Sequence, residues 1–326
     1  MSQGLTRDEV AEGYRLFLRR EPESEDAING AIEKYADVGA YWRGLLSSDE
    51  FQRGWSRSGE ANQYIMETMS KAFWALPATI EHEVSADRMD QLVARISEQW
   101  TALGEVEPHY SVLTHEDFRA EKMDEENIRR FRETGRTAAS IIETFEKRSG
   151  HDPHSGVCLE LGCGVGRITR FLAERFDQII AVDISAGNLR LCTEYMQEEG
   201  VTNVTTVHIS GLAELEALPE IDFFYSIIVL QHNSPPIQKA ILRTLLSKIR
   251  PGGGVLFQIP TDIPGYHFSA DVYLNSAEPE MEMHALPKPV VLQLLSEAGL
   301  VLSDIAPDGF IGEFGSNTFY AVKPSA

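Results

Sequence analysis

The segment from Val157 to Asp183 constrains the fold of this chain more than any other part of the sequence. It begins with a short apolar run, continues into glycines at positions 162, 164 and 166, and ends in a second apolar run closed by Asp183. Glycine lets a backbone turn sharply and approach other groups closely, because it has no Cβ atom. The segment therefore predicts a strand, a tight turn, a helix and a second strand, the first crossover of a parallel sheet.

Short β-branched runs and amphipathic stretches alternate over the whole chain beyond residue 150. This alternation is typical of an α/β fold, a doubly wound sheet of mainly parallel strands with helices on both faces. The expected strands are 157–161, 178–183, 204–209, 223–230, 254–259, 300–305 and 317–322, and the expected helices are 165–176, 186–199, 236–249 and 287–298. A short connection joins the last two strands, so we expect them to pair antiparallel.

The first half of the chain is predicted to be all-α. Thr6 followed by Glu9 is a capping-box pattern, which indicates the start of a helix, and further helices are expected over 24–35 and from Val38. Apolar residues then recur at helical spacing over 64–103, as in a helix–helix seam. The expected domains are a small helical domain (1–58), a helical linker or dimerising helix pair (59–107) and the α/β domain (108–326).

Composition and charge exclude several classes of protein. The net charge of −21 disfavours nucleic acid and anionic membrane surfaces as partners, although it also serves solubility alone. The three cysteines, Cys158, Cys163 and Cys192, have no metal-like spacing and indicate no disulfide framework. No apolar run approaches the roughly 18 residues that span a bilayer. We therefore expect a cytoplasmic protein without a signal peptide or membrane span.

Asp183 and the glycines before it predict a nucleotide-like ligand. A carboxylate at the end of the second strand can accept hydrogen bonds from both hydroxyls of a ribose. The helix after the glycines points its free N–H groups at the same place. A dinucleotide fingerprint that starts at Gly162 requires glycine at position 167, where this chain has Arg167. The spacing therefore disfavours a nicotinamide dehydrogenase.

The stretch VCLELGCGVGRITRFLAERFDQIIAVDIS closely resembles the first two sequence motifs of class I S-adenosylmethionine methyltransferases. The resemblance continues through Ile221-Asp222-Phe223 and Ile249–Gly254, and it implies a Rossmann-like seven-stranded sheet that binds S-adenosyl-L-methionine and releases S-adenosyl-L-homocysteine. It also implies the cofactor-binding set: Glu160 with Gly162, Gly164 and Gly166 at the methionine end, Asp183 at the ribose, Ser210, Gly211 and Leu212 along the adenine, and Cys163, Ile184 and Leu230 completing it. Without a cofactor, the glycines serve only the turn and 210–212 is an ordinary loop.

His232 is the candidate catalytic residue. It follows the fourth expected strand, and the carboxyl ends of strands in an open sheet face the ligand crevice. An imidazole there could take the proton of a hydroxyl acceptor as a general base, or it could simply cap the strand. Asn233-Ser234-Pro235-Pro236 matches only in part the Asn/Asp-Pro-Pro-aromatic motif of amino methyltransferases, which favours O-methylation.

The connection 260–287 is long for a loop and is expected to cover the acceptor. The candidate acceptor contacts are Tyr266, His267 and His284 in this connection, and His109 and Tyr110 ahead of the α/β domain. The last two could equally form a strap between domains. Glu280, Glu282 and His284 alternate, but no second histidine lies nearby in sequence, so we predict no metal.

Three stretches resemble bacterial proteins that act on glycans. EMHALPKPVVLQLLSEAGL and PHYSVLT are similar to segments of methyltransferases encoded with polysaccharide synthesis, and YRLFLRREPESEDAINGAIEKY resembles a small helical domain of unknown function found beside glycan-processing enzymes. The resemblance implies that a sugar hydroxyl of a glycan or glycan precursor is methylated. Two alternatives stay open: a small-molecule methyltransferase of secondary metabolism, and a non-catalytic scaffold that senses the cofactor. A homodimer through the N-terminal helices is a further expectation.

Overall fold

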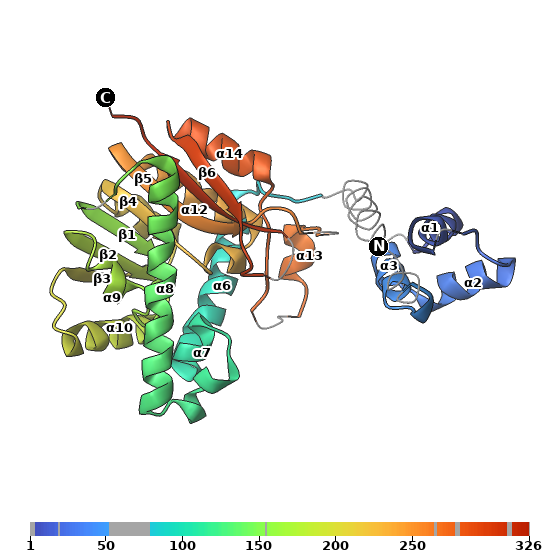
Figure 1. Cartoon of the computed structure of the whole chain (residues 1–326), viewed down its shortest axis with the longest axis horizontal. Helices are drawn as coiled ribbons and strands as arrows, with labels where there is room; N and C mark the ends of the chain where they lie inside the picture. The colour runs from blue at the N-terminus through green and yellow to red at the C-terminus, as the bar shows by residue number, and fades with distance from the viewer. Residues whose placement is uncertain are drawn as a thin grey trace. The chain divides into compact units, whose positions relative to one another are not determined.

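The computed structural model describes residues 4–18, 20–51, 79–153, 155–263, 266–277, 281–311 and 315–325 of the 326-residue chain. The chain divides into two compact units, Met1–Ala78 and Thr79–Ala326 (Figure 1). The expected apolar helical positions from Tyr64 to Leu76 lie outside the described residues.

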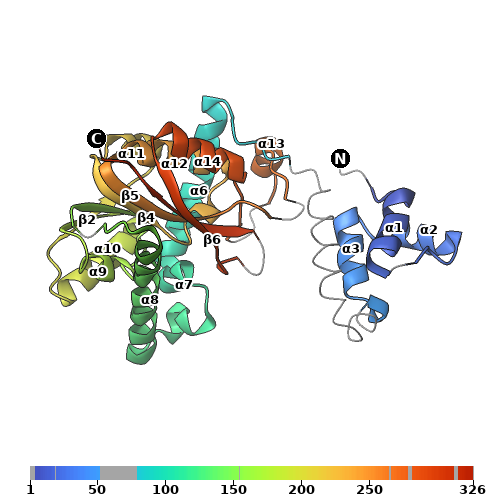
Figure 2. The same cartoon turned by 45° about the horizontal axis from the view of Figure 1, so that its top comes forward.

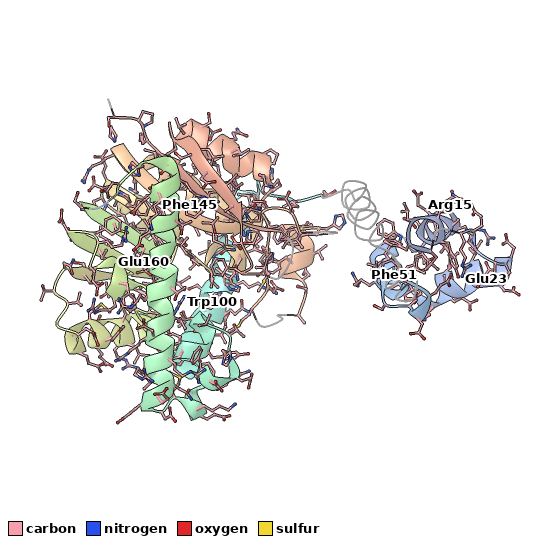
Figure 3. The ribbon with its side chains drawn as sticks, in the orientation of Figure 1. Arg15, Glu23, Phe51, Trp100, Phe145 and Glu160 are labelled. Carbon is pink, nitrogen blue, oxygen red and sulfur yellow. The ribbon has the colours of Figure 1, made fainter. Side chains whose placement is uncertain are left out.

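Three short α-helices lie in the described residues of the first unit. They are α1 (Arg7–Gly13), which a π-helical turn Tyr14–Leu18 extends, α2 (Glu25–Lys34) and α3 (Val38–Leu46). The predicted capping box at Thr6 and Glu9 is confirmed, with both reciprocal hydrogen bonds present. Phe17 packs edge to face against Trp42 and Phe51, with ring centroids 5.7 and 6.5 Å away, respectively. Figure 3 labels Phe51 within this unit. These aromatic contacts join the helices around a small core of their own.

The second unit is built on a seven-stranded sheet of order β3-β2-β1-β4-β5-β7-β6. Its strands are β1 (Val157–Leu161), β2 (Gln178–Asp183), β3 (Val204–His208), β4 (Ile221–Ser226), β5 (Ile249–Pro260), β6 (Val301–Pro307) and β7 (Ser316–Val322). β7 pairs antiparallel with both β5 and β6, and every other pairing is parallel. This confirms the predicted Rossmann-like seven-stranded sheet and the predicted antiparallel final strands.

Helices cover both faces of this sheet (Figure 1, Figure 2). They are α6 (Ala86–Val106), α7 (Pro108–Val112), α8 (Glu125–Ser149), α9 (Thr169–Leu172), α10 (Ala186–Glu198), α11 (Leu212–Ala217), α12 (Pro235–Ser247), α13 (Ala270–Leu274) and α14 (Lys288–Glu297). Alternate residues of each strand enter different cores: Phe257 packs with α6, α12 and α14, whereas Leu256 packs with α8 and α10. A strand that is buried on both faces reads as a continuous apolar run, which is why the strands were visible in the sequence.

Two elements end or begin several residues away from the expected bounds and are much shorter. The helix predicted over 165–176 is reduced to α9, because Gly164 and Gly166 have positive φ angles of 54° and 85° and keep the chain in turns before it. The strand predicted over 223–230 ends at Ser226. Ile228 has a φ of 61°, and a 3-10 turn (Leu230–His232) follows it, so this stretch cannot continue the ladder.

The boundary between the units falls earlier than the one expected at residue 107. Residues 79–107 belong to the second unit, because α6 buries Leu92 and Ile96 in the same core as the sheet. The extended segment before α6 is also fixed there: Phe268 exchanges main-chain hydrogen bonds with Thr79 and Glu81, each 3.0 Å long. The described part of the expected helical linker is therefore a wall of the α/β domain.

Candidate functional site

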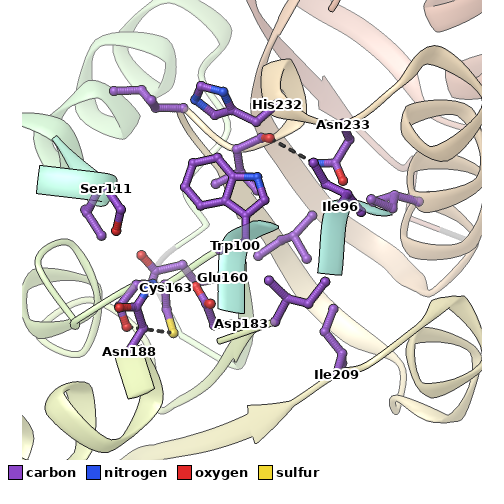
Figure 4. A pocket seen from close by; sticks show the side chains of 18 of the residues that line it. Ile96, Trp100, Ser111, Glu160, Cys163, Asp183, Asn188, Ile209, His232 and Asn233 are labelled. Carbon is purple, nitrogen blue, oxygen red and sulfur yellow. Dashed lines mark hydrogen bonds between the residues drawn. The ribbon is translucent and has the colours of Figure 1, made fainter. Parts of the chain in front are cut away.

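A pocket lies where the carboxyl ends of β1, β2 and β4 meet, and α6 and α7 form part of its wall (Figure 4). It holds about 1050 Å³ of space with its open mouth included, a size suited to a cofactor or small molecule. Its lining is Val93, Ile96, Trp100, Ser111, Val112, Glu160, Leu161, Gly162, Cys163, Gly164, Arg167, Ile168, Asp183, Ile184, Asn188, Ile209, Gly211, Leu212, Leu215, Ile227, Ile228, Val229, His232, Asn233, Ile237 and Ile241.

The glycine-rich turn after β1 forms one wall of this pocket. Gly162 and Gly164 have φ angles of 73° and 54°, in the left-handed region that favours glycine. A Cβ atom on Gly164 would collide with the side chain of Val112 on α7. The turn therefore brings its backbone directly against the helix that closes this side of the pocket.

Asp183 ends β2 beside this turn, and its carboxylate is almost fully buried. One oxygen accepts the N–H of Gly164 and the other accepts the N–H of Ser185, both at 2.8 Å. Burial raises the pKa of Asp183 above its ordinary value, against the lowering effect of these N–H donors. Each carboxylate oxygen has a second lone pair, so Asp183 can still accept hydrogen bonds from the hydroxyls of a ligand in the pocket.

Glu160 is the other buried carboxylate of the pocket. It accepts a hydrogen bond of 2.6 Å from the Thr169 hydroxyl, and burial raises its pKa to about 7. The guanidinium of Arg167 lies close enough to lower that pKa, and Arg167 is itself only 4% exposed. A buried carboxyl group and a buried guanidinium thus lie close together in the lining of the same pocket.

Two buried polar groups of the lining have no hydrogen-bond partner among the described residues. They are the Oδ1 atom of Asn188, in the first turn of α10, and the Nε atom of Arg167. Buried polar groups in folded proteins are nearly always paired. A polar ligand would supply these partners, so the residues present fit a nucleoside with a polar appendage.

His232 lies across the pocket from Glu160 and Asp183, and Trp100 lies between them (Figure 4). The imidazole is 7% exposed, and its centroid is 4.9 Å from that of the Trp100 ring. Its Nδ1 atom is 3.0 Å from the main-chain oxygen of Glu282. Burial lowers the pKa of His232 to about 4, so the ring is neutral near pH 7.

A chain of buried side-chain amides ends at the other nitrogen of His232. The Ile228 N–H donates to Oε1 of Gln258 (2.9 Å), and Nε2 of Gln258 donates to Oε1 of Gln231 (3.0 Å). The Gln231 amide nitrogen is in turn 3.2 Å from Nε2 of His232. Because the first donor is a main-chain N–H, the order of donors is fixed along the chain, and Nε2 of His232 is an acceptor.

Most of the predicted cofactor-binding residues lie around the pocket. Its lining includes Glu160, Gly162, Cys163, Gly164, Asp183, Ile184, Gly211 and Leu212. Three predicted residues do not line it. Gly166 faces Cys192 and Met196 of α10, Ser210 is exposed and donates to Glu214 (2.7 Å), and Leu230 is fully buried in the core.

The predicted acceptor contacts are scattered. None of the five lines the pocket, although Ser111 and Val112, the residues next to His109 and Tyr110, do. His109 packs against Phe131, and the guanidinium of Arg119 stacks over the ring of Tyr110. His267 is exposed. Only Tyr266 and His284 come together, through a hydrogen bond of 2.8 Å between the hydroxyl and Nδ1.

Tyr266 and His284 belong to a buried polar cluster that fixes the connection after β5. His284 Nε2 is 3.3 Å from the carboxylate of Glu282, and the guanidinium of Arg95 on α6 lies 3.9 Å from the same carboxylate. Arg95 also stacks over the ring of Tyr273 and donates to its main-chain oxygen at 2.6 Å. The connection therefore packs against α6 and reaches His232 through the Glu282 carbonyl.

The described residues hold no group of three or more His, Cys, Asp or Glu side chains arranged to bind a metal. Glu280 of the alternating Glu-Glu-His pattern lies outside these residues. Among the helices that the structure describes, none is long and apolar enough to cross a membrane.

Trp100, Arg167, Asn188 and Asn233 line the pocket but were not predicted to do so. Trp100 is one of several apolar residues at helical spacing, a pattern that equally fits a buried helix–helix contact. Asn188 lies in the first turn of a helix, where asparagine is common and does not indicate a ligand site. The sequence did mark Arg167 as unusual, because it stands where the dinucleotide pattern has its third glycine. Its burial beside Glu160 depends on packing against α8, which sequence spacing does not reveal.

Residues 158–253 match the sequence profile of the family described as "Methyltransferase domain". The matched segment runs from β1 into β5 and includes the glycine-rich turn, Asp183 and His232. It is therefore a methyltransferase domain, and the sheet around it has the class I arrangement that the sequence motifs predicted.

Curated relatives match parts of the chain. An uncharacterized protein of Synechococcus is 37% identical over 98 residues, which are 29% of this chain and 23% of that protein. The ubiquinone biosynthesis O-methyltransferase of Pseudomonas fluorescens is 29% identical over 100 residues, which are 30% of this chain and 42% of the relative. This chain thus spans less than half the length of either relative.

Solved structures of low sequence identity are similar to parts of the chain. Magnesium protoporphyrin IX methyltransferase from Synechocystis, with bound SAM, is 16% identical with a TM-score of 0.49 and covers 71% of this chain and 97% of its own. The 1,6-didemethyltoxoflavin-N1-methyltransferase of Burkholderia thailandensis, with bound S-adenosylhomocysteine, is 18% identical with a TM-score of 0.47 and covers 76% of this chain and 95% of its own.

Proposed function

We propose that this chain is an S-adenosylmethionine-dependent O-methyltransferase. The observation that carries the proposal is the shared pocket of the glycine-rich turn, Asp183 and Glu160 inside a segment that matches the methyltransferase domain family. The glycine-rich turn lets the cofactor approach the backbone closely. Asp183 would accept hydrogen bonds from the ribose hydroxyls, and Glu160 would contact the methionine end of the cofactor. Ile209, Gly211 and Leu212 form the apolar side on which an adenine would lie.

S-adenosylmethionine, when bound, supplies a methyl group on a sulfonium ion. The residues of this chain would hold the methyl donor and the acceptor in line and exclude water from between them. Positioning of this kind is the main requirement for transfer between two bound molecules. Trp100 and Val112 wall the pocket from α6 and α7, and Val229 packs behind Gly162. The acceptor then has access from the side of His232 and Asn233.

His232 is the proposed group for the hydroxyl proton of the acceptor. Its neutral ring has a hydrogen on Nδ1 and a lone pair on Nε2, the form that a base requires. Nε2 already receives the Gln231 amide at 3.2 Å, so an acceptor hydroxyl has to share or replace this long contact. With a pKa of about 4 the ring orients a hydroxyl well but binds a proton weakly.

The proposed acceptor is a sugar hydroxyl of a glycan or glycan precursor, which rests on the resemblance of the sequence to polysaccharide-associated methyltransferases. Trp100 beside His232 supports it, because the C–H face of a sugar ring packs well on an aromatic ring. The second candidate is a small apolar molecule. Val93, Ile96, Ile237 and Ile241 favour it, since these aliphatic side chains offer no hydrogen bonds to hydroxyl groups. A cytoplasmic location and a homodimer through the N-terminal helices stay predictions.

Calorimetry with the full chain tests the cofactor. We expect S-adenosylhomocysteine to bind and NAD not to bind; binding of NAD alone contradicts the proposal. A screen with methyl-labelled cofactor then separates the two acceptor classes. Transfer to nucleotide-sugars or cell-surface glycans supports the glycan hypothesis, whereas transfer only to small aromatic phenols favours the alternative.

A further inference from the structure

Ile228, just beyond the end of β4, has a backbone conformation that a β-branched residue rarely adopts. Its φ of 61° lies in the left-handed region, which favours glycine. A residue keeps such a conformation only where its surroundings hold it there, and such residues cluster next to functional groups. In this conformation the N–H of Ile228 donates to Oε1 of Gln258 at 2.9 Å. The strained turn therefore fixes which end of the Gln258 amide accepts and which end donates.

The hydrogen bonds that continue from Gln258 all run in one direction. Nε2 of Gln258 donates to Oε1 of Gln231, and Nε2 of Gln231 donates to Nε2 of His232. The ring of His232 then donates from Nδ1 to the main-chain oxygen of Glu282. The chain thus begins at an N–H, which can only donate, and ends at a carbonyl oxygen, which can only accept. Gln258 and Gln231 are 0% and 1% exposed, so turning either amide round would leave buried groups without partners.

A protonated His232 does not fit this chain. An imidazolium donates from both ring nitrogens, so a hydrogen on Nε2 would point at the amide hydrogens of Gln231. Gln231 could accept that hydrogen only by turning its oxygen towards the ring. Its own amide hydrogens would then lie opposite the donor on Gln258. Gln258 therefore opposes protonation of the ring through Gln231.

The charges around His232 act in addition to this chain. Burial is the main cause that lowers the pKa of His232 to about 4; the Glu282 carbonyl raises that pKa, and a charge on His284 lowers it. The ring that packs on His232 from α6 belongs to Trp100 and carries no charge. Other charged groups on the surrounding elements are the Glu282 carboxylate, Arg95 behind it on α6, and Glu160, Arg167 and Asp183 in the pocket. All of these groups are present whether or not residue 258 carries an amide, so the contribution of the chain can be measured separately.

We propose that Gln258 is a positioning residue for His232: acting through Gln231, it keeps an N–H donor against Nε2 and so holds the ring in the neutral form that a base requires. This inference rests on the proposed function, in which His232 takes the proton of the acceptor hydroxyl. Gln258 is not part of the pocket lining, so its effect on the site is carried by the two amides.

NMR of the full chain with ¹⁵N-labelled histidine measures the protonation of each ring nitrogen. The chain has nine histidines, and the signals of His232 are those that disappear in His232→Asn. In the wild type without ligand we expect a hydrogen on Nδ1 and none on Nε2. With a pKa of about 4, no more than about a tenth of the ring should be protonated at pH 5. A hydrogen on Nε2, or half-protonation near pH 6.5, would overturn the inference in the wild type alone.

The variant Gln258→Met removes both functions of the amide and leaves Gln231 free to turn its oxygen towards Nε2. An acceptor in that position favours the protonated ring. We therefore expect the pKa of His232 to rise by about one unit or more, so that about half of the ring or more is protonated at pH 5.

Gln238→Met is the matched control. Gln238 is also a fully buried glutamine, and its Nε2 donates to the main-chain oxygens of Leu230 (2.8 Å) and His284 (3.2 Å). It thus joins the same two segments as the chain does, but through their main chains rather than through the imidazole. This control should leave the protonation of His232 at pH 5 as it is in the wild type.

An unchanged titration of His232 in a folded Gln258→Met overturns the inference. An equal rise in Gln238→Met also overturns it, because the effect then comes from loosened packing. If Gln258→Met does not fold, Gln231→Met gives the second measurement. It removes the donor to Nε2, so the neutral ring loses a hydrogen bond and its pKa should again rise; an unchanged pKa there contradicts the inference as well.

These measurements use neither cofactor nor acceptor, so the two hypotheses can fail separately. A chain that does not bind S-adenosylhomocysteine contradicts the proposed function, whatever the protonation of His232. A ring that titrates independently of Gln258 contradicts the positioning role, whatever the cofactor affinity.

Discussion

The main-chain oxygen of Glu282 lies 3.0 Å from Nδ1 of His232, although the two residues are 50 positions apart. A carbonyl oxygen can only accept, so Nδ1 carries the hydrogen and Nε2 the lone pair. The connection after β5 therefore helps to set the tautomer of the proposed catalytic histidine. It does so through its backbone, which no side-chain substitution at position 282 removes.

Replacement of His232 by alanine should lower turnover by about 100-fold or more, the usual worth of a positioned acid–base group. Affinity for S-adenosylhomocysteine should stay within about threefold, because His232 lies across the pocket from Asp183. Initial rates and calorimetry on the same preparation check both statements. His267→Ala, at an exposed histidine of the same connection, serves as the control. An unchanged rate in His232→Ala would remove the proposed role.

Titration of His232 should cause no fall in the rate as the pH drops from 8 towards 5. Burial lowers the pKa of His232 to about 4, so its lone pair is lost only below that pH and not near 6.5. The measurement is turnover at saturating cofactor and acceptor across this range. Glu160, which lines the same pocket, has a pKa of about 7 and therefore does titrate within this range. A fall near pH 6.5 that persists in Glu160→Gln would show that the imidazole titrates normally.

Asp183→Ala should weaken binding of S-adenosylhomocysteine by at least about tenfold. The variant removes the acceptors for a ribose and leaves the N–H groups of Gly164 and Ser185 without their partner. Calorimetry gives the affinity. Asp177→Ala is the matched control, since Asp177 precedes the same strand and accepts the N–H of Gly156 at 2.8 Å, away from the pocket. Equal affinity in Asp183→Ala and the wild type contradicts the assignment.

Glu160 should make the ligand-free chain less stable as the pH rises. Its pKa is about 4.5 when unfolded and about 7 when folded, so between these values the folded chain holds a proton that the unfolded chain has released. Stability therefore falls with rising pH in this window, by at most about 3 kcal/mol. Thermal unfolding at pH 5 and pH 8 measures this effect. The stability of Glu160→Gln relative to the wild type should be greater at pH 8 than at pH 5. The same difference at both pH values means that the Glu160 carboxyl titrates normally.

The sequence predicted the sheet and the nucleotide end of the pocket well, because both depend on local patterns. Strands buried on two faces are continuous apolar runs, and a turn with positive φ needs glycine at fixed positions. Gly162, Gly164 and Asp183 therefore came from spacing alone. The cap of α1 was equally visible, since Thr6 and Glu9 satisfy each other within one turn.

The acceptor side could not be predicted in the same way. It depends on contacts between segments far apart in the chain, such as Arg95 with Glu282 and Gln258 with Gln231. The positive φ of Ile228, which ends β4 early, accompanies a hydrogen bond to a side chain of β5 and leaves no mark in local composition. Histidines and tyrosines in a loop do not reveal whether they face a pocket or one another, as Tyr266 and His284 do.

The position of α6 has a consequence for the order in which the protein is assembled. Its neighbours α10, α12 and α13 all come later in the chain, so α6 leaves the ribosome before anything exists for Leu92 and Ile96 to pack against. This wall of the pocket is therefore synthesised before the helices against which it packs. Until α13 has been synthesised, this apolar face has to be shielded in some other way, and the interval exposes a nascent chain to aggregation.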